Sequence, residues 1–265
     1  MVKFGFIGTG NMGGALARAA RKKLSGSDIL LANRTAAKAE TLAAELGCRA
    51  VDNAAAAEQA EFLFLGVKPY MVAGLMEEIG PVLAARKDRF VLVSMAAALT
   101  IPDLRQRGCG DWPVIRIMPN TPSAVGEGVI FYTCDGVTEE ELAAFLEAMS
   151  GAGRLLPLDD HLMDAGSAVA GCGPAFVDLF IEAMADGGVA CGLSRPMAME
   201  CAAQTLIGAA KLMLATGTHP GALKDAVCSP SGATIQGVRT LEKAGFRGAV
   251  IDAVIAAYEK SAQMK

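Results

Sequence analysis

The chain has few aromatic residues, almost no histidine and no closely paired cysteines, and each shortage excludes a class of protein. Aromatic residues are 5% of the 265, and only two histidines, His161 and His219, occur, far apart. A histidine–cysteine metal site is therefore not expected. The seven cysteines are odd in number and form no Cys-x-x-Cys pair, which is typical of reduced thiols in a cytoplasmic protein. The nucleophile elbow of a serine hydrolase is also missing.

Basic excess and long apolar runs are lacking too. The formal net charge is −4 and the pI is near 5.3, which argues against nucleic acid or an anionic membrane as partner. No continuous apolar run reaches bilayer-spanning length. The chain starts directly with its first expected strand, so we expect no signal peptide and a cytoplasmic location. Its 52% hydrophobic content and 30 glycines indicate small-residue helices packed on a sheet.

The most informative segment that is present is KFGFIGTGNMGG, residues 3–14. A short apolar run leads into Gly8, Gly10 and Gly13, spaced as G-x-G-x-x-G, and a helical pattern follows. This is the order that a dinucleotide site requires. The first glycine permits a tight turn, the second lets a pyrophosphate approach the backbone, and the third lets the helix pack on the strand. The helix N-terminus then offers N–H groups to the phosphates.

Apolar runs alternate with helical patterns through the first half of the chain. The expected strands are Lys3–Gly8, Ile29–Ala32, Arg49–Val51, Phe62–Gly66, Phe90–Ser94 and Val114–Met118, with Gly128–Thr133 and Arg154–Leu158 as candidate edge strands. This rhythm predicts an α/β fold, with a Rossmann dinucleotide-binding domain over residues 1–159. Residues 160–265 are expected to be all helical. Pro196–Ala215 is apolar nearly all round, which favours packing against a second copy over a monomeric bundle.

The end of the second expected strand bears on the choice of cofactor. An acidic residue there, about 20 residues past the glycine turn, would bind a ribose 2′-hydroxyl and select NAD. This chain has Asn33 and Arg34 instead, with Thr35 and Lys38 nearby. The pattern favours NADP, because a guanidinium binds a 2′-phosphate and no carboxylate repels it. The alternative is that Asn33 caps the next helix and Arg34 is a solvated surface charge.

Three further loops follow expected strands at the carboxyl edge of the sheet, where ligands bind in parallel sheets. Lys68-Pro69 could supply a general acid, a cofactor contact or only a surface charge. The small residues of SMAAALT, 94–100, would let the backbone approach a nicotinamide ring, although tight packing explains them equally well. RIMPNTPSAVGEG, 116–128, is interpreted as part of the active-site wall, with a structural turn as the alternative.

The segment Ser229-Pro230-Ser231-Gly232 separates two helical patterns near the end of the chain. Ser231, Gly232, Ala233 and Thr234 would present N–H groups and hydroxyls at a helix N-terminus. Such a terminus is suited to a carboxylate. The alternative is an ordinary helix cap with no ligand.

Taken together, these segments resemble the pyrroline-5-carboxylate reductase family over essentially the whole chain. The segments that carry the resemblance are GFIGTGNMGGA, FLGVKP, SMAAALTI, VIRIMPNTP with Glu127-Gly128, AGCGPAF, EAMADGGVACGL and LKDAVCSPSGATIQGVRTLE. The resemblance implies reduction of 1-pyrroline-5-carboxylate to L-proline, the final step of proline biosynthesis, with NADPH as donor and NADH as a weaker one. It also implies a helical domain that interlocks with a partner subunit, as a homodimer or an assembly of dimers.

The resemblance assigns residues to each part of the site. The cofactor would contact Gly8, Thr9, Gly10, Asn11, Met12, Asn33, Arg34, Asn53, Val67, Lys68, Pro69, Ala96 and Ala97. The loop Ser229–Thr234 would bind the substrate, with its carboxylate on the N–H groups of Ser231, Gly232 and Ala233. Thr234 would be the catalytic residue, hydrogen-bonded to the ring nitrogen. No metal is implied.

The chain departs from the family pattern at a few positions. Ser231 and Ala98 stand where the family commonly has glycine, so a positive φ at Ser231 would cost strain. Cys172 stands where the family commonly has serine, and Cys228 stands where it often has serine or threonine. None of these changes removes a proposed contact.

Two rival functions are weighed against a reductase of this family. A β-hydroxyacid dehydrogenase would carry a catalytic lysine on a helix after the sheet. Between residues 160 and 240 the only lysines are Lys211 and Lys224, and neither lies in the first turns of the helix expected from Pro174. A non-catalytic NADP-binding protein would bind the cofactor without turnover.

Overall fold

The computed structural model describes residues 2–263, with side chains described from Phe4 onward. The chain forms two compact units. Residues up to 171, together with those from Tyr258, make the first unit, and Cys172–Ala257 make the second. The boundary expected from the sequence lies earlier, at 159/160. Residues 160–171 join the first unit because Met163 and Ala168 are fully buried.

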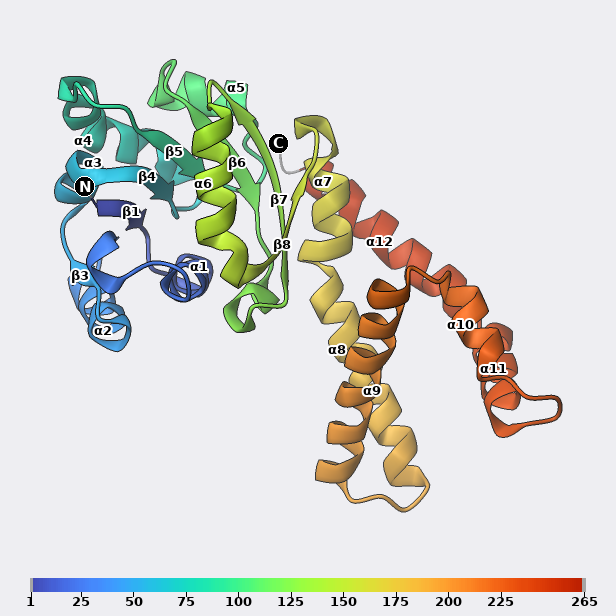
Figure 1. Cartoon of the computed structure of the whole chain (residues 1–265). Helices are drawn as coiled ribbons and strands as arrows, with labels where there is room; N and C mark the ends of the chain where they lie inside the picture. Colours follow the sequence, from blue (N-terminus) through green and yellow to red (C-terminus); the bar gives the residue numbers. More distant parts are fainter. Residues whose placement is uncertain (1, 264–265) are drawn as a thin grey trace. The chain divides into compact units, whose positions relative to one another are not determined.

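Within residues 2–263 the first unit is built on one eight-stranded sheet (Figure 1). Its strands are β1 (Val2–Ile7), β2 (Ile29–Ala32), β3 (Arg49–Ala50), β4 (Ala60–Leu65), β5 (Val91–Ser94), β6 (Val114–Met118), β7 (Gly128–Asp135) and β8 (Gly153–Pro157). Their order across the sheet is β3-β2-β1-β4-β5-β6-β7-β8. Strands β1 to β6 are parallel to one another, β7 is antiparallel to β6, and β8 is parallel to β7. This confirms the Rossmann-type α/β fold.

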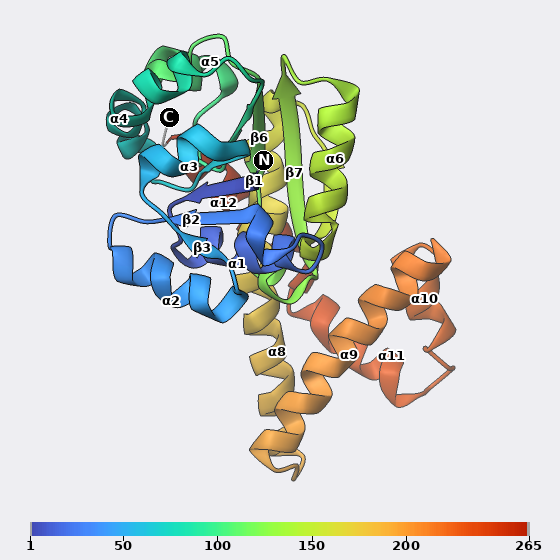
Figure 2. The ribbon, with the colours of Figure 1, turned by 60° about the vertical axis from the view of Figure 1, so that its left-hand side comes forward.

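Helices cover both faces of the sheet (Figure 2). They are α1 (Asn11–Arg21), α2 (Ala36–Leu46), α3 (Asn53–Gln59), α4 (Val72–Ala85), α5 (Ile101–Leu104), α6 (Glu139–Met149) and the short α7 (Met163–Gly166). Residues of α1, α2 and α6 pack with one face of the strands, and residues of α3, α4 and α5 pack with the other. Strands β2, β4, β5 and β6 are buried on both faces for most of their length, so they are mostly apolar, although β6 also buries Arg116.

Phenylalanine rings fill the core on the face covered by α1, α2 and α6. Phe6 stacks on Phe64 with 4.2 Å between ring centroids, and Phe4 lies 5.1 Å from Phe64. Phe145 of α6 completes the cluster at 6.1 Å from Phe64. All four side chains are at most 1% exposed. Although aromatic residues are scarce in the chain, they are concentrated where they bury most area.

The second unit consists of helices. They are α8 (Gly173–Ala190), α9 (Arg195–Thr216), α10 (Pro220–Ala226), α11 (Ala233–Lys243) and the part of α12 (Phe246–Ala262) that ends at Ala257. Its cluster of buried apolar residues consists of Ala185, Ala198 and Ala202. By contrast, Leu179 is 68% exposed and Leu212 is 53% exposed. Apolar surface of this kind is typical of protein–protein contact.

One helical stretch among the described residues, Asp160–Ala190, is long and apolar enough to cross a bilayer by length and composition, with a mean hydropathy of 1.5. The stretch is not a continuous apolar run, because it contains Asp164, Asp178, Glu182 and Asp186. Asp178, Glu182 and Asp186 are four residues apart along α8, so they share one face of that helix. A π-helical turn, Ser167–Gly171, also interrupts the stretch. Carboxylates on one face of a helix carry a free-energy cost inside a lipid bilayer. The segment is therefore better suited to packing against protein than to crossing a membrane.

Candidate functional site

The turn between β1 and α1 has the close approaches that its glycines were expected to permit. Gly8 has a φ of +102°, and a Cβ built on it would lie 2.3 Å from the Gly66 carbonyl oxygen. A Cβ on Gly13 would lie 2.0 Å from the Gly8 carbonyl oxygen. Both positions therefore exclude any larger residue, because the neighbouring atoms are backbone and cannot move aside.

Gly10 differs from these two, because a Cβ built on it would meet nothing within 4 Å. The fold of the chain does not require glycine there, so the empty space is available to a ligand. Gly10 is also the N-cap of α1, which has no side-chain cap and no acidic residue in its first turn. The first N–H groups of α1 are therefore free to bind a phosphate.

Two cavities meet at this turn. The β5-side cavity, of about 910 Å³, extends toward the loop after β5 and is lined by Asn11, Met12, Ala97 and Ala98, among others. The β2-side cavity, of about 820 Å³, extends toward the loop after β2. Both are lined by Gly10, Gly66, Val67, Lys68 and Tyr70. One elongated ligand could thus lie in both cavities and cross the glycine turn between them.

The β2-side cavity holds the residues expected to select the cofactor. Arg34 and Lys38 line it, and neither side chain forms a hydrogen bond or ion pair with another described residue. Asn33 does not cap α2, because its side chain accepts a hydrogen bond from the Thr9 N–H at 3.2 Å and donates one to the Thr35 carbonyl at 3.1 Å. Asn33 thereby ties the glycine turn to the end of β2.

Asn53 also lines the β2-side cavity, at the start of α3. Its amide nitrogen donates to both carboxylate oxygens of Glu78 on α4, each at 3.1 Å. The preceding residue, Asp52, is the N-cap of α3 and accepts a hydrogen bond from the Ala55 N–H at 2.7 Å. The start of α3 and helix α4 therefore bring carboxylate oxygens to this cavity, while Arg34 and Lys38 after β2, together with Lys68 after β4, bring cations.

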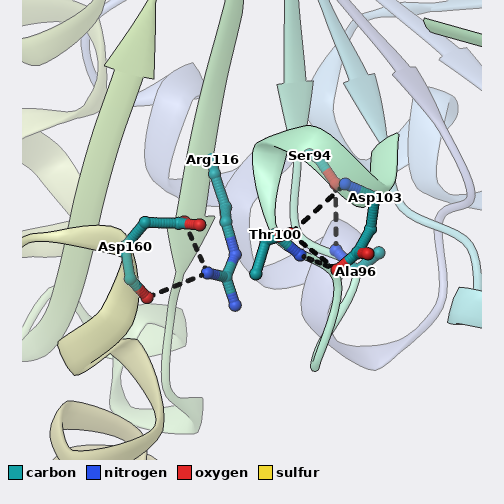
Figure 3. A network of polar contacts seen from close by, with 6 residues as sticks. All are labelled: Ser94, Ala96, Thr100, Asp103, Arg116 and Asp160. Atoms are coloured by element: carbon teal, nitrogen blue, oxygen red, sulfur yellow. Dashed lines mark hydrogen bonds and ion pairs between the residues drawn. The ribbon is translucent and has the colours of Figure 1, made fainter. Parts of the chain in front are cut away.

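The loop after β5 is held by a network of polar contacts (Figure 3). The Ala96 N–H donates to the Ser94 hydroxyl at 3.3 Å, and the Ala96 side chain is buried and lines neither cavity. Thr100 and Asp103 form a reciprocal capping box at the start of α5. The hydroxyl and N–H of Thr100 donate to the Asp103 carboxylate at 2.6 and 2.9 Å. These hydrogen bonds lower the pKa of Asp103 below its usual value.

The segment 116–128 does not line either cavity, so its expected place in the active-site wall is not seen there. Arg116 is 1% exposed and donates to the Asp160 carboxylate at 2.6 Å (Figure 3). Asn120 donates to the Ala170 carbonyl at 2.9 Å and accepts from the Val129 N–H at 2.9 Å. Within the first unit, Arg116 and Asn120 therefore hold residues 160–171 against the sheet through hydrogen bonds.

The expected substrate loop lies in the second unit, and its geometry differs in one respect from the expectation. The N–H of Gly232 already donates to the Ser229 carbonyl at 3.0 Å, which closes a turn. Helix α11 begins at Ala233 with Gly232 as its N-cap and no side-chain cap. Among the described residues, the N–H groups of Ser231, Ala233 and Thr234 donate to no other group. Thr234 is exposed in the first turn of α11.

Ala98 and Ser231 are the two non-glycine residues of the described chain that have a positive φ, at 63° and 60°. They lie in the loop after β5 and in the loop before α11, the two loops that the sequence assigned to nicotinamide and substrate. A left-handed conformation at such residues costs about 1 kcal/mol or more, and this strain clusters at functional sites. The strain expected for serine at position 231 is therefore present.

An open glycine turn at a sheet edge, with a basic pocket on one side, is the site of a nicotinamide-dinucleotide-dependent oxidoreductase. Residues 3–98 match the family model described as NADP oxidoreductase, coenzyme F420-dependent. Residues 160–264 match the family model described as pyrroline-5-carboxylate reductase dimerisation. The chain belongs to the pyrroline-5-carboxylate reductase family.

Relatives of this family match the chain from end to end. The pyrroline-5-carboxylate reductase of Escherichia coli (strain K12) is 40% identical, with 99% of this chain and 98% of that protein covered. The Pisum sativum enzyme is 39% identical, with 98% and 95% covered. The structure of Plasmodium falciparum pyrroline carboxylate reductase with NADP bound has a TM-score of 0.87 and 30% identity, covering 99% of this chain and 98% of that one. A Coxiella burnetii pyrroline-5-carboxylate reductase has a TM-score of 0.90 and 26% identity, covering 100% and 98%.

Proposed function

We propose that the protein catalyses the reduction of 1-pyrroline-5-carboxylate to L-proline, the final step of proline biosynthesis. The observation that carries this proposal is the 40% identity to a reductase of that name over 99% of the chain, which includes both the glycine turn and the loop before α11. NADPH supplies a hydride to the imine carbon when it is bound. NADH is proposed as a weaker donor.

The first unit is proposed to bind the cofactor. Gly10 and the uncapped start of α1 would take the pyrophosphate, as the empty space beside Gly10 supports. Arg34 would bind the 2′-phosphate, with Lys38 beside it in the same cavity. The remaining cofactor contacts are proposed at Gly8, Thr9, Asn11, Met12, Asn33, Asn53, Val67, Lys68, Pro69, Ala96 and Ala97. The Thr9 N–H is taken by Asn33, and Ala96 is buried and lines neither cavity, so these two would contribute through other atoms.

The second unit is proposed to bind the substrate at residues 229–234. Its carboxylate would be held by the N–H groups of Ser231 and Ala233, while the Gly232 N–H keeps the turn closed. Ser229 would support that turn, since its carbonyl accepts this bond. The Thr234 hydroxyl would donate a hydrogen bond to the ring nitrogen and relay the proton. A threonine hydroxyl is a poor acid, so positioning would supply most of the acceleration.

We further propose that the protein acts in the cytoplasm as a homodimer or an assembly of dimers, without nucleic acid, membrane or metal. The exposed apolar side chains of α8 and α9 support self-association. The proposed working division is a dinucleotide-binding domain over 1–159 and a dimerisation and substrate-binding domain over 160–265.

A spectrophotometric assay of the purified protein with 1-pyrroline-5-carboxylate and NADPH tests the function. We expect NADPH oxidation that depends on the imine and forms one proline per NADPH. Tight NADPH binding without turnover would identify a non-catalytic binding protein instead. Turnover of β-hydroxyacids alone would identify a dehydrogenase of that class.

A further inference from the structure

Tyr70 is the most exposed large apolar or aromatic side chain of the described chain, at 81%. It follows Lys68-Pro69 in a short turn, Pro69–Met71, that leads into α4. An aromatic ring gains most when its faces are covered, and no other described side chain covers this one. Tyr70 also lies where the two cavities meet and lines both. Its place in the fold is therefore next to whatever fills them.

The β2-side cavity has charged and apolar parts. Arg34 and Lys38 come from the segment after β2, Lys68 follows β4, and Asp52 and Glu78 add carboxylates. Apolar surface is supplied by Met71, just before α4, and by Leu75 in the first part of α4. Gly74 lies between them, and a Cβ built on it would meet nothing within 4 Å. A ligand with a phosphate at one end and a flat, uncharged ring at the other matches the two cations after β2 and the apolar surface of Met71 and Leu75.

We propose that Tyr70 binds the cofactor by stacking its ring on the adenine, against the wall formed by Met71, Gly74 and Leu75. The inference rests on the proposed binding of the 2′-phosphate by Arg34. Tyr70 is the one aromatic side chain that lines the β2-side cavity among the described residues. Met71, Gly74 and Leu75 line this cavity and not the β5-side one, which assigns the ring to the adenosine half of the cofactor.

Stacking suits this position for two physical reasons. Each base offers a flat face, and alanine replacement of a stacked aromatic residue weakens base binding by roughly 5- to 150-fold. Tyrosine also has few rotatable bonds, so little conformational entropy is lost when it is ordered on a ligand. Since the ring makes the contact, the hydroxyl group is dispensable.

Binding of 2′,5′-ADP, which is the adenosine half of NADPH with its 2′-phosphate, tests the proposal by isothermal titration calorimetry on the full-length protein. We expect Tyr70→Ala to weaken binding about tenfold and Tyr70→Phe to bind as the wild type does. Arg34→Ala, as the control for cofactor placement, should weaken it at least as much. Because Tyr70 is exposed, all variants should keep the wild-type circular dichroism spectrum.

The possible outcomes distinguish stacking by Tyr70 from the binding of the 2′-phosphate by Arg34. Wild-type affinity in Tyr70→Ala, with a clear loss in Arg34→Ala, would overturn the stacking and leave the cofactor site in place. An equal loss in Tyr70→Phe and Tyr70→Ala would also overturn it, because the hydroxyl would then make the contact. No binding to the wild type, or no effect of Arg34→Ala, would overturn both the stacking and the placement of the 2′-phosphate.

Discussion

The two units of the chain bury their apolar residues to very different extents. The first unit encloses phenylalanine, leucine and isoleucine side chains on both faces of its sheet. Among its described residues, the second unit buries only three alanines as apolar core, while leucines and methionines of α8 and α9 are exposed. The difference indicates that the first unit is stabilised by its own core. The second unit needs further surface, and another copy of the chain supplies it most simply.

The largest expected effect is the loss of stability caused by a substitution in the core of the first unit. Phe64→Ala removes a fully buried ring that lies 4.2 Å from Phe6. We expect the free energy of unfolding to fall by about 3–5 kcal/mol, since the cavity left behind adds to the lost transfer free energy. Urea denaturation followed by circular dichroism measures this. A loss below about 1 kcal/mol would show that this core is not tightly packed.

The next prediction compares two side chains that are similarly exposed, one in each unit. Their replacement should affect self-association differently. Leu179 of α8 is 68% exposed, and Val125 of the first unit is 73% exposed. Leu179→Ser should weaken dimerisation by about 2 kcal/mol per copy if a partner buries this residue. Val125→Ser should change association and stability by less than about 0.5 kcal/mol. Sedimentation equilibrium at several concentrations distinguishes them, and identical behaviour would contradict self-association through α8.

A third substitution tests the binding role of the first unit. Arg34→Ala should raise the KM for NADPH about tenfold to a hundredfold, which corresponds to the ~1.5–3 kcal/mol of a charge-assisted phosphate contact. Use of NADH should be almost unchanged, because it has no 2′-phosphate. Initial rates with both cofactors measure this. An equal effect on the two would show that Arg34 does not contact the 2′-phosphate.

The smallest effect concerns the cap of α5. The pKa of Asp103 is lowered in the folded protein, first by the hydrogen bond from the Thr100 hydroxyl. Its contribution to stability is therefore present above the unfolded pKa of about 4 and is lost as the pH falls through the lower folded value. Asp103→Asn should cost about 1 kcal/mol at neutral pH. Urea unfolding at several pH values should show this difference shrinking in acid, and a constant difference would contradict it.

Local patterns predicted the strands of the sheet and the close contacts of Gly8 and Gly13, because alternating elements and glycine spacing depend on neighbouring residues. They could not show contacts between distant parts of the chain. Arg116 binds Asp160 across 44 positions of sequence, and residues 160–171 belong to the first compact unit. Likewise, the Gly232 N–H is used within its own turn. Tyr70 has no sequence signal, since only its exposure beside two cavities marks it.

The proposed function divides the work between the units, with the cofactor bound by the first and the substrate by the second. Thr234→Val keeps the β-branched shape at the start of α11 and removes the hydroxyl. The most direct measurement is therefore the kcat for 1-pyrroline-5-carboxylate together with the NADPH Kd, in the wild type and in this variant. We predict that kcat falls while the NADPH Kd is unchanged, because the hydroxyl stabilises the transition state more than the bound substrate. A wild-type kcat in Thr234→Val, or a weakened NADPH Kd, would contradict this division.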